Sequence, residues 1–433
     1  MTLVDTLPST RRGHDAVIEV DAEPRLDRVV VINDVSVMSG GATGVALSSL
    51  ELLAAQGVPI TFIVGDDGVH ADPRSRVGEF LAFGCRHILD RGVLDAAVSG
   101  LYNARAEKLL SRWIAANDTP RTIYHLHGWS KVLSPAVFRA LRPVARRVVI
   151  TAHDFFLVCP NGGYFNFRSE KPCRLRPMGL SCLLTACDRR NYAHKVWRWV
   201  RLGIQRILLD LGEDVGTVLA VHDGMIDHLV RGGVPRHKLR VLRNSVVPWR
   251  SARVEAERNR TFTFVGRLER EKGIDLLARA ARVAGVPLRV IGRGPLAAPL
   301  AAEFPEVEQV GWKTQAEISA LISDTRVVAM PSRCRESLGL AALEALTSGV
   351  PAVISDHAMI SQEVANAGFG FACDPHDEAL FASVLMKLAQ DDALVASMSR
   401  RAYSDAWRLA CTPPQWAADL MCIYRGLLQP EPA

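Results

Sequence analysis

The sequence Glu336-Ser-Leu-Gly-Leu-Ala-Ala-Leu-Glu344 lies between two apolar runs, 327–331 and 350–354. This pattern predicts a strand, a helix that begins near Gly339, and a second strand. Glu336 then lies in the loop before the helix, and Glu344 about 7–8 Å along the helix axis from Gly339. The free N–H groups of the first helical turn favour an anion such as a diphosphate, and the two carboxylates can accept hydrogen bonds from sugar or ribose hydroxyls. The alternative is a pair of solvated helix glutamates.

Strands and helices alternate along the rest of the chain, whose 433 residues are too many for one ordinary core. We therefore predict an α/β protein with two Rossmann-like, doubly wound domains that face each other across a cleft, with ligands at the carboxyl ends of the strands. Strands are predicted at 29–32, 60–64, 122–126, 147–151, 219–221, 239–242, 262–265, 288–291 and 307–310, and helices at 45–56 and 274–284.

The predicted boundaries follow changes in composition. Residues 1–25 are polar and are expected to form a flexible leader. Residues 26–250 form the first domain, which includes a basic, cysteine-containing insertion at 159–206. The charged segment 251–260 reads as a linker. Residues 261–412 form the second domain, and 413–433 carry a C-terminal helix.

The composition, with 48% hydrophobic and 23% charged residues, is typical of a soluble globular protein. No apolar run is long enough to span a membrane, and the N-terminus lacks the apolar core of a signal peptide, so we expect a cytoplasmic protein. The formal net charge of +6 suits anionic ligands or membrane surfaces but is too small to indicate nucleic acid, which we do not expect as a partner. The nine cysteines fit reduced thiols.

Residues at the predicted strand ends are candidates for ligand binding. Gly40 and Gly41 follow the first strand and let the backbone approach a ligand, although the full dinucleotide fingerprint is absent and a tight turn is the alternative. Arg267 and Lys272 follow the first strand of the second domain, where a guanidinium and an ammonium suit a diphosphate, unless they are ordinary surface cations.

Two further polar residues follow strands of the first domain. His153 lies at the end of the strand predicted at 147–151, where it would face the cleft and contact a ligand; a structural histidine is the alternative. Asn244 follows the last strand of this domain and is suited to orient a hydroxyl, or equally to stabilise a turn.

Three motifs, in this order, resemble those of the group 1 (family 4) retaining glycosyltransferases of GT-B fold. They are Gly266-Arg-Leu-Glu-Arg-Glu-Lys-Gly273, Ile291-Gly-Arg-Gly-Pro295 and the segment 331–349 with its two glutamates. The resemblance extends over nearly the whole chain and is strongest over 262–356. One departure is Leu338, where the family often has Phe, which puts the shape of the sugar pocket in doubt.

This resemblance implies a nucleotide-sugar donor held mainly by the second domain. Arg267 and Lys272 would contact the diphosphate, Glu336 the sugar hydroxyls and Glu344 the ribose. His153 would face the sugar, and Gly41 the phosphate or the acceptor. The C-terminal helix would cross back to the first domain. The remaining implied substrate-binding positions are Gly40, Asn244, Gly266, Gly292, Gly294, Leu338, Gly339 and Leu340.

The implied reaction is transfer of a hexose-type sugar, with retention, to a glycan or lipid-linked saccharide in cell-surface polysaccharide or glycoconjugate biosynthesis. Fixed cations and helix N–H groups stabilise the leaving diphosphate more in the transition state than in the ground state. No cofactor or metal is expected, because the nucleotide sugar is a co-substrate and no D-x-D motif lies in a fitting context. The alternatives are a nucleotide-sugar epimerase of the same fold, and a non-catalytic protein that binds lipid or nucleic acid through the insertion.

The insertion is strongly basic: residues 168–206 contain ten Lys or Arg and two acidic residues. Cations beside Trp and Leu/Ile at 195–211 are typical of an interfacial helix, unless the helix faces the core with a solvated basic side. We expect this region to contact the inner face of the cytoplasmic membrane or a lipid-diphosphate acceptor. Four cysteines are candidates for a structural zinc site, although C-x2-C pairs are missing and free thiols are the alternative: Cys159, Cys173, Cys182 and Cys187.

Overall fold

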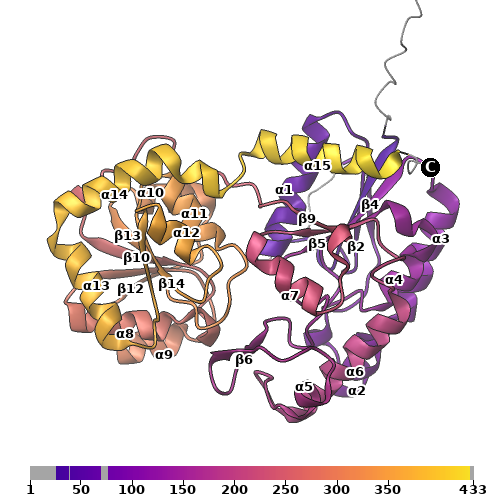
Figure 1. Ribbon diagram of the computed structural model, residues 1–433, viewed down its shortest axis with the longest axis horizontal. Helices are drawn as coiled ribbons and strands as arrows, with labels where there is room; N and C mark the ends of the chain where they lie inside the picture. Colours follow the sequence, from indigo (N-terminus) through magenta and orange to yellow (C-terminus); the bar gives the residue numbers. More distant parts are fainter. Residues whose placement is uncertain (1–25, 39, 70–76, 430–433) are drawn as a thin grey trace, which may run out of the picture.

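The computed structural model describes residues 26–38, 40–69 and 77–429, so the predicted leader at 1–25 lies outside the described residues. Two parallel sheets, one from residues 28–241 and one from residues 261–373, form two α/β domains that lie side by side (Figure 1). The predicted fold class, two Rossmann-like domains, is confirmed.

The first domain is built on a seven-stranded sheet of order β3-β2-β1-β4-β5-β8-β9 in which all neighbours are parallel. Strands β2, β4 and β5 are buried along their whole length, as expected for parallel strands covered on both faces. The strands are β1 (Arg28–Asn33), β2 (Ile60–Val64), β3 (Glu79–Ala82), β4 (Thr122–Leu126), β5 (Val148–Ala152), β8 (Thr217–Ala220) and β9 (Leu239–Val241).

The helices of the first domain include α1, which begins at Gly41 and therefore earlier than predicted. Gly40 is the N-cap, and its carbonyl accepts a hydrogen bond from the Gly44 N–H at 3.0 Å, so the predicted glycine loop is the first turn of the helix. A short antiparallel hairpin, β6 (Phe165–Asn166) and β7 (Lys171–Pro172), lies in the insertion. The helices are α1 (Gly41–Ala55), α2 (Val93–Leu101), α3 (Ala104–Asn117), α4 (Ala136–Leu141), α5 (Leu180–Leu184), α6 (Tyr192–Leu208) and α7 (Ile226–Arg231).

The second domain has a six-stranded parallel sheet of order β12-β11-β10-β13-β14-β15. Its strands are β10 (Thr261–Val265), β11 (Leu288–Ile291), β12 (Glu308–Gly311), β13 (Thr325–Met330), β14 (Ala352–Ser355) and β15 (Gly370–Cys373). Its helices are α8 (Ile274–Ala284), α9 (Ala297–Glu303), α10 (Gln315–Ile322), α11 (Leu340–Thr347), α12 (Ser361–Asn366), α13 (Glu378–Gln390) and α14 (Asp392–Asp405).

The segment 251–260, which the sequence suggested as a linker, packs on the second domain. Its Val254 and Ala256 side chains are buried, and the carbonyls of Glu257 and Asn259 each accept a hydrogen bond from Arg326 at 3.0 Å. The Arg326 side chain is fully buried. The charged composition of this segment does not predict its packing, because backbone carbonyls make many of the contacts and large apolar side chains are absent.

The last helix, α15 (Pro413–Leu428), runs from the second domain across to the first and lies beside α1 (Figure 1). Its buried residues, among them Trp416, Leu420 and Tyr424, share an apolar cluster with Val31 and Phe62 of the first sheet. A second apolar cluster is continuous between the domains. None of the described helices is both long and apolar enough to cross a membrane.

Candidate functional site

The helix predicted from the opening motif is α11, and its N-terminus depends on Gly339. This residue is the N-cap and has left-handed backbone angles (φ 76°, ψ 58°). A Cβ at this position would also lie 2.9 Å from the Met330 side chain, so any larger residue would be both strained and crowded. The N–H groups of Ala342 and Leu343 donate to the Gly339 carbonyl, so the N–H groups available to an anion are those of Leu340 and Ala341 at the start of the helix.

Lys272 and Glu336 form a partly buried ion pair next to this helix. The turn η6 (Arg270–Lys272) ends at Gly273, which also has positive φ and approaches Pro331 so closely that a Cβ would lie 1.9 Å from its carbonyl oxygen. The Lys272 ammonium donates a hydrogen bond to Glu336 Oε1, as does the Ser332 hydroxyl at 2.7 Å. Burial opposes the ionisation of Glu336, but Lys272 outweighs it and lowers the pKa of the carboxyl. The pair is therefore charged at neutral pH.

Arg267, the second predicted cation, lies at the rim of the same site. Its Nη1 donates to Glu269 Oε1 at 2.8 Å, and its side chain is half exposed. Its charge also contributes, after Lys272, to lowering the pKa of Glu336. The structure thus brings together the two cations and the carboxylate that the sequence placed in separate motifs.

Glu344 lies in the second turn of α11 and is partly buried. No hydrogen bond or ion pair reaches its carboxyl group from the part of the chain that the structure describes. Burial raises the pKa of Glu344 to about 8. A neutral carboxyl group can both donate and accept hydrogen bonds, as a ribose diol requires. The ribose contact stays a prediction.

The glycines of the other two motifs have a structural role. A Cβ at Gly292 would lie 1.8 Å from the Gly266 carbonyl oxygen, and one at Gly294 would lie 2.4 Å from the carbonyl oxygen of Leu268. The loops after β10 and β11 therefore lie backbone against backbone, joined by the hydrogen bond from the Leu268 N–H to the Arg293 carbonyl at 2.9 Å. Their contact with substrate stays a prediction.

His153, at the end of β5, belongs to a histidine cluster that sequence reasoning missed. Its Nε2 lies 3.1 Å from His127 Nδ1. The neighbouring His125 binds Thr151 through Nε2 and the Tyr424 hydroxyl of α15 through Nδ1, both at 2.7 Å. Burial lowers the pKa of His153 to about 4 and that of His125 to about 3, so both rings are neutral at pH 7. The available signal was the pattern His125-Leu-His127 at a strand end.

The hydrogen bonds of this cluster select one tautomer of His153. His127 Nε2 is buried and has no hydrogen-bond partner, so a proton there would be an orphaned buried donor. The proton of His127 is therefore best placed on Nδ1, from which it is donated to His153 Nε2. His153 then carries its own proton on Nδ1, which remains a donor for a ligand.

The two domains touch where the N-termini of α1 and α11 meet. A Cβ at Gly41 would lie 3.5 Å from the Leu340 side chain, so these two helix ends face each other. Leu338 is buried in the apolar cluster that is continuous between the domains, and its side chain packs there. Asn244 is buried beside the bridge that pairs Ser245 with Cys411, and its amide makes no hydrogen bond to a described site residue.

Ion pairs also join the domains. Arg189 of the insertion pairs with Glu271 and, at 3.5 Å, with Glu269. Glu170, in the turn between β6 and β7, pairs with Arg270 at 2.9 Å and with Arg333 at 3.2 Å. Arg333 is almost fully buried and also binds Asp275 at 2.6 Å, so the basic sequence before Glu336 does not offer this guanidinium to a substrate.

The four cysteines of the insertion do not form the predicted ligand set. No three of their sulfurs lie within 4.8 Å of one another in the described chain. Instead the Asn161 amide lies between Cys159 (3.2 Å) and Cys187 (3.3 Å), and the buried Lys195 donates to Cys182 at 3.2 Å. All four are free thiols in the structure.

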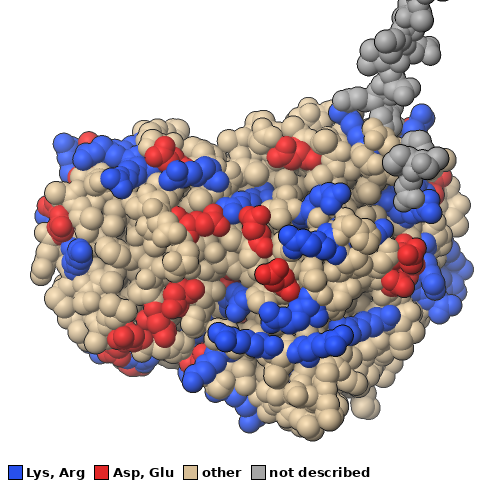
Figure 2. All heavy atoms as spheres, in the orientation of Figure 1, with Lys and Arg blue, Asp and Glu red and all other residues tan. Residues whose placement is uncertain are grey.

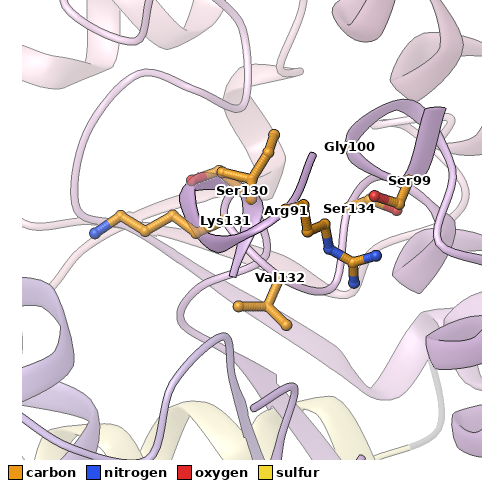
Figure 3. A pocket seen from close by; sticks show the side chains of 8 residues that line it. Arg91, Ser99, Gly100, Ser130, Lys131, Val132 and Ser134 are labelled. Atoms are coloured by element: carbon orange, nitrogen blue, oxygen red, sulfur yellow. The ribbon is translucent and has the colours of Figure 1, made fainter. Parts of the chain in front are cut away.

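A small cavity lies elsewhere in the first domain, between α2 and the loop after β4 (Figure 3). Its volume of about 10 Å³ is close to that of one water position, so it has no room for a nucleotide sugar. Arg91, Ser99, Ser130 and Lys131 are among its lining residues.

Comparison with known proteins finds a family match for the second domain. Residues 248–405 match the family model of the glycosyl transferases group 1. The glycogen synthase of Mycobacterium tuberculosis is 30% identical over 217 residues, which cover 45% of this chain and 51% of that protein. The D-inositol 3-phosphate glycosyltransferase of Corynebacterium urealyticum is 33% identical over 184 residues, which cover 38% and 42%. The chain spans about half the length of the curated relatives it matches.

Solved structures match over nearly the whole chain. The sucrose-phosphate synthase of Thermosynechococcus elongatus superposes with a TM-score of 0.67 at 17% identity, over 93% of this chain and 99% of that chain. Alr3699/HepE of Anabaena in complex with UDP-glucose superposes with a TM-score of 0.63 at 14% identity, over 91% and 99%. The resemblance to the group 1 glycosyltransferases of GT-B fold is confirmed.

Proposed function

Because residues 248–405 match the family model of the glycosyl transferases group 1, we propose that this chain is a retaining hexosyltransferase. It would transfer a hexose-type sugar from a nucleotide-sugar donor to a glycan or lipid-linked saccharide. The observation that carries the proposal is the Lys272–Glu336 pair, held beside the N-terminus of α11 by the close approach of Gly273 to Pro331.

The pair suits a diphosphate-linked sugar. An ammonium has three N–H donors, so Lys272 can hold Glu336 and a phosphate oxygen at the same time. Arg267 and the first-turn N–H groups of α11 supply further donors for the negative charge that grows on the leaving diphosphate. Glu336, kept ionised by Lys272, can accept hydrogen bonds from sugar hydroxyls.

His153 supports the same function from the first domain. As a neutral ring with its proton on Nδ1, it can donate a hydrogen bond to a sugar hydroxyl without adding a positive charge next to an oxocarbenium-like sugar. The low pKa of about 4 keeps it neutral over the physiological pH range.

The relatives suggest which donor to try first. One solved neighbour binds UDP-glucose, and the matched relatives are a glycogen synthase and a D-inositol 3-phosphate glycosyltransferase. We infer that the donor is a nucleoside-diphosphate hexose, with UDP-glucose as the first probe.

Titration calorimetry with UDP-glucose, GDP-mannose and ADP-glucose tests the proposal. We expect one of these donors to bind, and Lys272→Met to weaken its affinity by about 10–100-fold, since hydrogen bonds to charged groups contribute about 1.5–3 kcal/mol. Glu336→Gln keeps the acceptor for Ser332 and should also weaken binding. Lys108→Met, an exposed cation of α3, is the matched control.

Three results would count against the proposal. Binding of none of the three donors would remove its basis, as would a Lys272→Met variant that binds like the Lys108→Met control. Conversion of the donor into an isomeric nucleotide sugar without any acceptor would favour the epimerase. Release of free sugar and nucleotide, with the anomeric configuration retained, would support the transferase.

We also propose that the acceptor side of the protein contacts an anionic membrane, chiefly through the helices beside α6. In α6 the side chains of Lys195, Arg201 and Leu202 are buried, so one face of this helix is packed as in the core-facing alternative. Its other face exposes Val200 and Ile207. Further exposed aliphatic residues lie on the neighbouring helices α2 and α5.

The apolar patch of α2 and α5 is defined by aliphatic side chains that are 66–86% exposed: Val93, Leu94, Val98, Leu180 and Leu184. Both helices contact α6, and the three lie together at the lower end of the first domain in Figure 1. Figure 2 shows Lys and Arg side chains in a row across the lower part of this domain. Exposed cations of the insertion near α5 are Lys171, Arg174, Arg176 and Arg190. Exposed aliphatic groups beside cations are typical of an interfacial contact with anionic lipid.

A further inference from the structure

A group of metal-ligand residues lies at the carboxyl edge of the second sheet, outside the site described above. His357 follows β14, and Asp374 and His376 follow β15. One ligand atom from each of the three lies within 4.8 Å of the other two, and no other such group of three occurs in residues 26–38, 40–69 and 77–429. Because β14 and β15 are adjacent, their ends place the three side chains together.

Each histidine of this group has a carboxylate on one ring nitrogen. His376 Nε2 lies 3.1 Å from Glu170 Oε2, and His357 Nδ1 lies 2.9 Å from Asp356 Oδ1. Histidines that bind a metal usually donate their other N–H to a carboxylate, which selects the tautomer and orients the ring. Each of the two rings therefore has a carboxylate in the position that is usual for a histidine bound to a metal.

The remaining nitrogen of His376 also faces a carboxylate. His376 Nδ1 lies 3.0 Å from Asp374 Oδ1, and the same oxygen accepts a hydrogen bond from the His376 backbone N–H at 2.9 Å. This turn holds the carboxylate oxygen next to the ring nitrogen, so that both can face one cation.

We propose that His357, Asp374 and His376 bind a divalent cation of the Zn²⁺ type. Two imidazole nitrogens and one carboxylate oxygen match the ligand preference of Zn²⁺ and leave a fourth position open for water or another ligand. His376 would bind through Nδ1 and His357 through Nε2, with Glu170 and Asp356 as the outer carboxylates.

Such a site would couple the cation to the contact between the domains. Glu170 is in the turn between β6 and β7 of the first domain, whereas the three ligands belong to the second domain. A cation that fixes the His376 ring and polarises its N–H strengthens the hydrogen bond to Glu170, so cation binding and domain contact stabilise each other by linkage. This inference is independent of the donor sugar and of transfer.

Zinc titration of the full chain tests the proposal. The protein is freed of metal with EDTA and titrated with Zn²⁺ against a chromophoric chelator. We expect one equivalent to bind, and His357→Ala and His376→Ala each to abolish this binding. Glu170→Gln, which leaves the ligands intact, should weaken it by about 10–100-fold, the usual effect of losing an outer-shell partner. His237→Ala, an exposed histidine of the first domain, should change nothing.

Cobalt substitution separates this site from the cysteines of the insertion. Co²⁺ bound by imidazole and carboxylate gives d–d absorption without a thiolate-to-cobalt charge-transfer band, and we expect that spectrum. A charge-transfer band would overturn the assignment, because the metal would then be held by sulfur. Absence of Zn²⁺ binding, or equal affinity in His376→Ala and wild type, would overturn it as well.

Discussion

Lys272 and Glu336 illustrate what single residues contribute to this protein. They are far apart in the sequence, and the pair forms because Gly273 allows the backbone to approach Pro331. Both groups are largely withdrawn from water, with side chains 24% and 16% exposed, so each would be less favourable without the other. The residue types alone predicted a site for an anion and a polyol. The direct contact between Lys272 and Glu336 could not be predicted from them.

Glu344 carries a prediction about pH. An ordinary glutamate has a pKa near 4.5, and burial raises that of Glu344 to about 8. Between these two pH values the folded protein holds a proton that the unfolded chain releases, so the free energy of unfolding falls as the pH rises through this window. Glu344→Gln removes this dependence and should be more stable than wild type at pH 8.5, by an amount on the order of a few kcal/mol.

Urea unfolding at pH 5 and pH 8.5 measures this effect. The control is Glu303→Gln, an exposed glutamate of α9 that should leave the pH dependence of wild type unchanged. If wild type and Glu344→Gln lose equal stability between the two pH values, the carboxyl group is not buried in the way described.

At the scale of elements, the glycine loops after β10 and β11 show that a sequence motif can be required by packing between two loops. The motif Gly292-Arg-Gly294 resembles a ligand-binding sequence, but its glycines are needed because the loop backbone lies against Gly266 and Leu268. The structural need for glycine is visible only in the structure, and contact of these glycines with a ligand stays a prediction.

Gly292→Ala should therefore destabilise the second domain. Its Cβ would lie 1.8 Å from the Gly266 carbonyl oxygen at φ 152°, so the backbone must shift, and overpacking of this kind costs about 1–3 kcal/mol or more. Gly285→Ala is a matched control, since it also has positive φ (65°) but no atom within 4 Å of the added Cβ. Chemical unfolding should show a clearly larger loss for Gly292→Ala. Equal losses would mean that backbone strain alone, and not the close approach, requires glycine.

At the scale of the whole molecule, chain segments distant in sequence complete each domain. Helix α15 adds Trp416, Leu420 and Tyr424 to the core of the first domain, and the Tyr424 hydroxyl binds His125 next to the histidine cluster. The hairpin turn with Glu170 reaches the second domain. The relative position of the domains thus depends on the C-terminal helix and on the hairpin of the insertion.

The apolar patch of α2 and α5 gives a prediction at this scale. We expect the protein to co-sediment with vesicles that contain phosphatidylglycerol at low salt, and Leu94→Glu or Leu184→Glu to reduce binding about tenfold or more, because burying one leucine contributes about 1.5–3 kcal/mol. Arg174→Glu should weaken binding to these vesicles and should make the remaining binding less sensitive to salt. Leu380→Glu, on an exposed position of α13, is the control. A wild-type protein that stays in the supernatant would contradict the membrane proposal.

The sequence by itself determined the two doubly wound domains and most strand positions, and it singled out Arg267, Lys272 and Glu336, which the structure brings together. These signals are local: apolar runs, helix formers and glycines act within a few residues of themselves. Only the tertiary structure decided that Glu336 pairs with Lys272, that His125 and His127 support His153, that one face of α6 packs on the core, and that Arg333 is satisfied internally. The reason is that burial and partnership depend on segments distant in the chain, which no local pattern encodes.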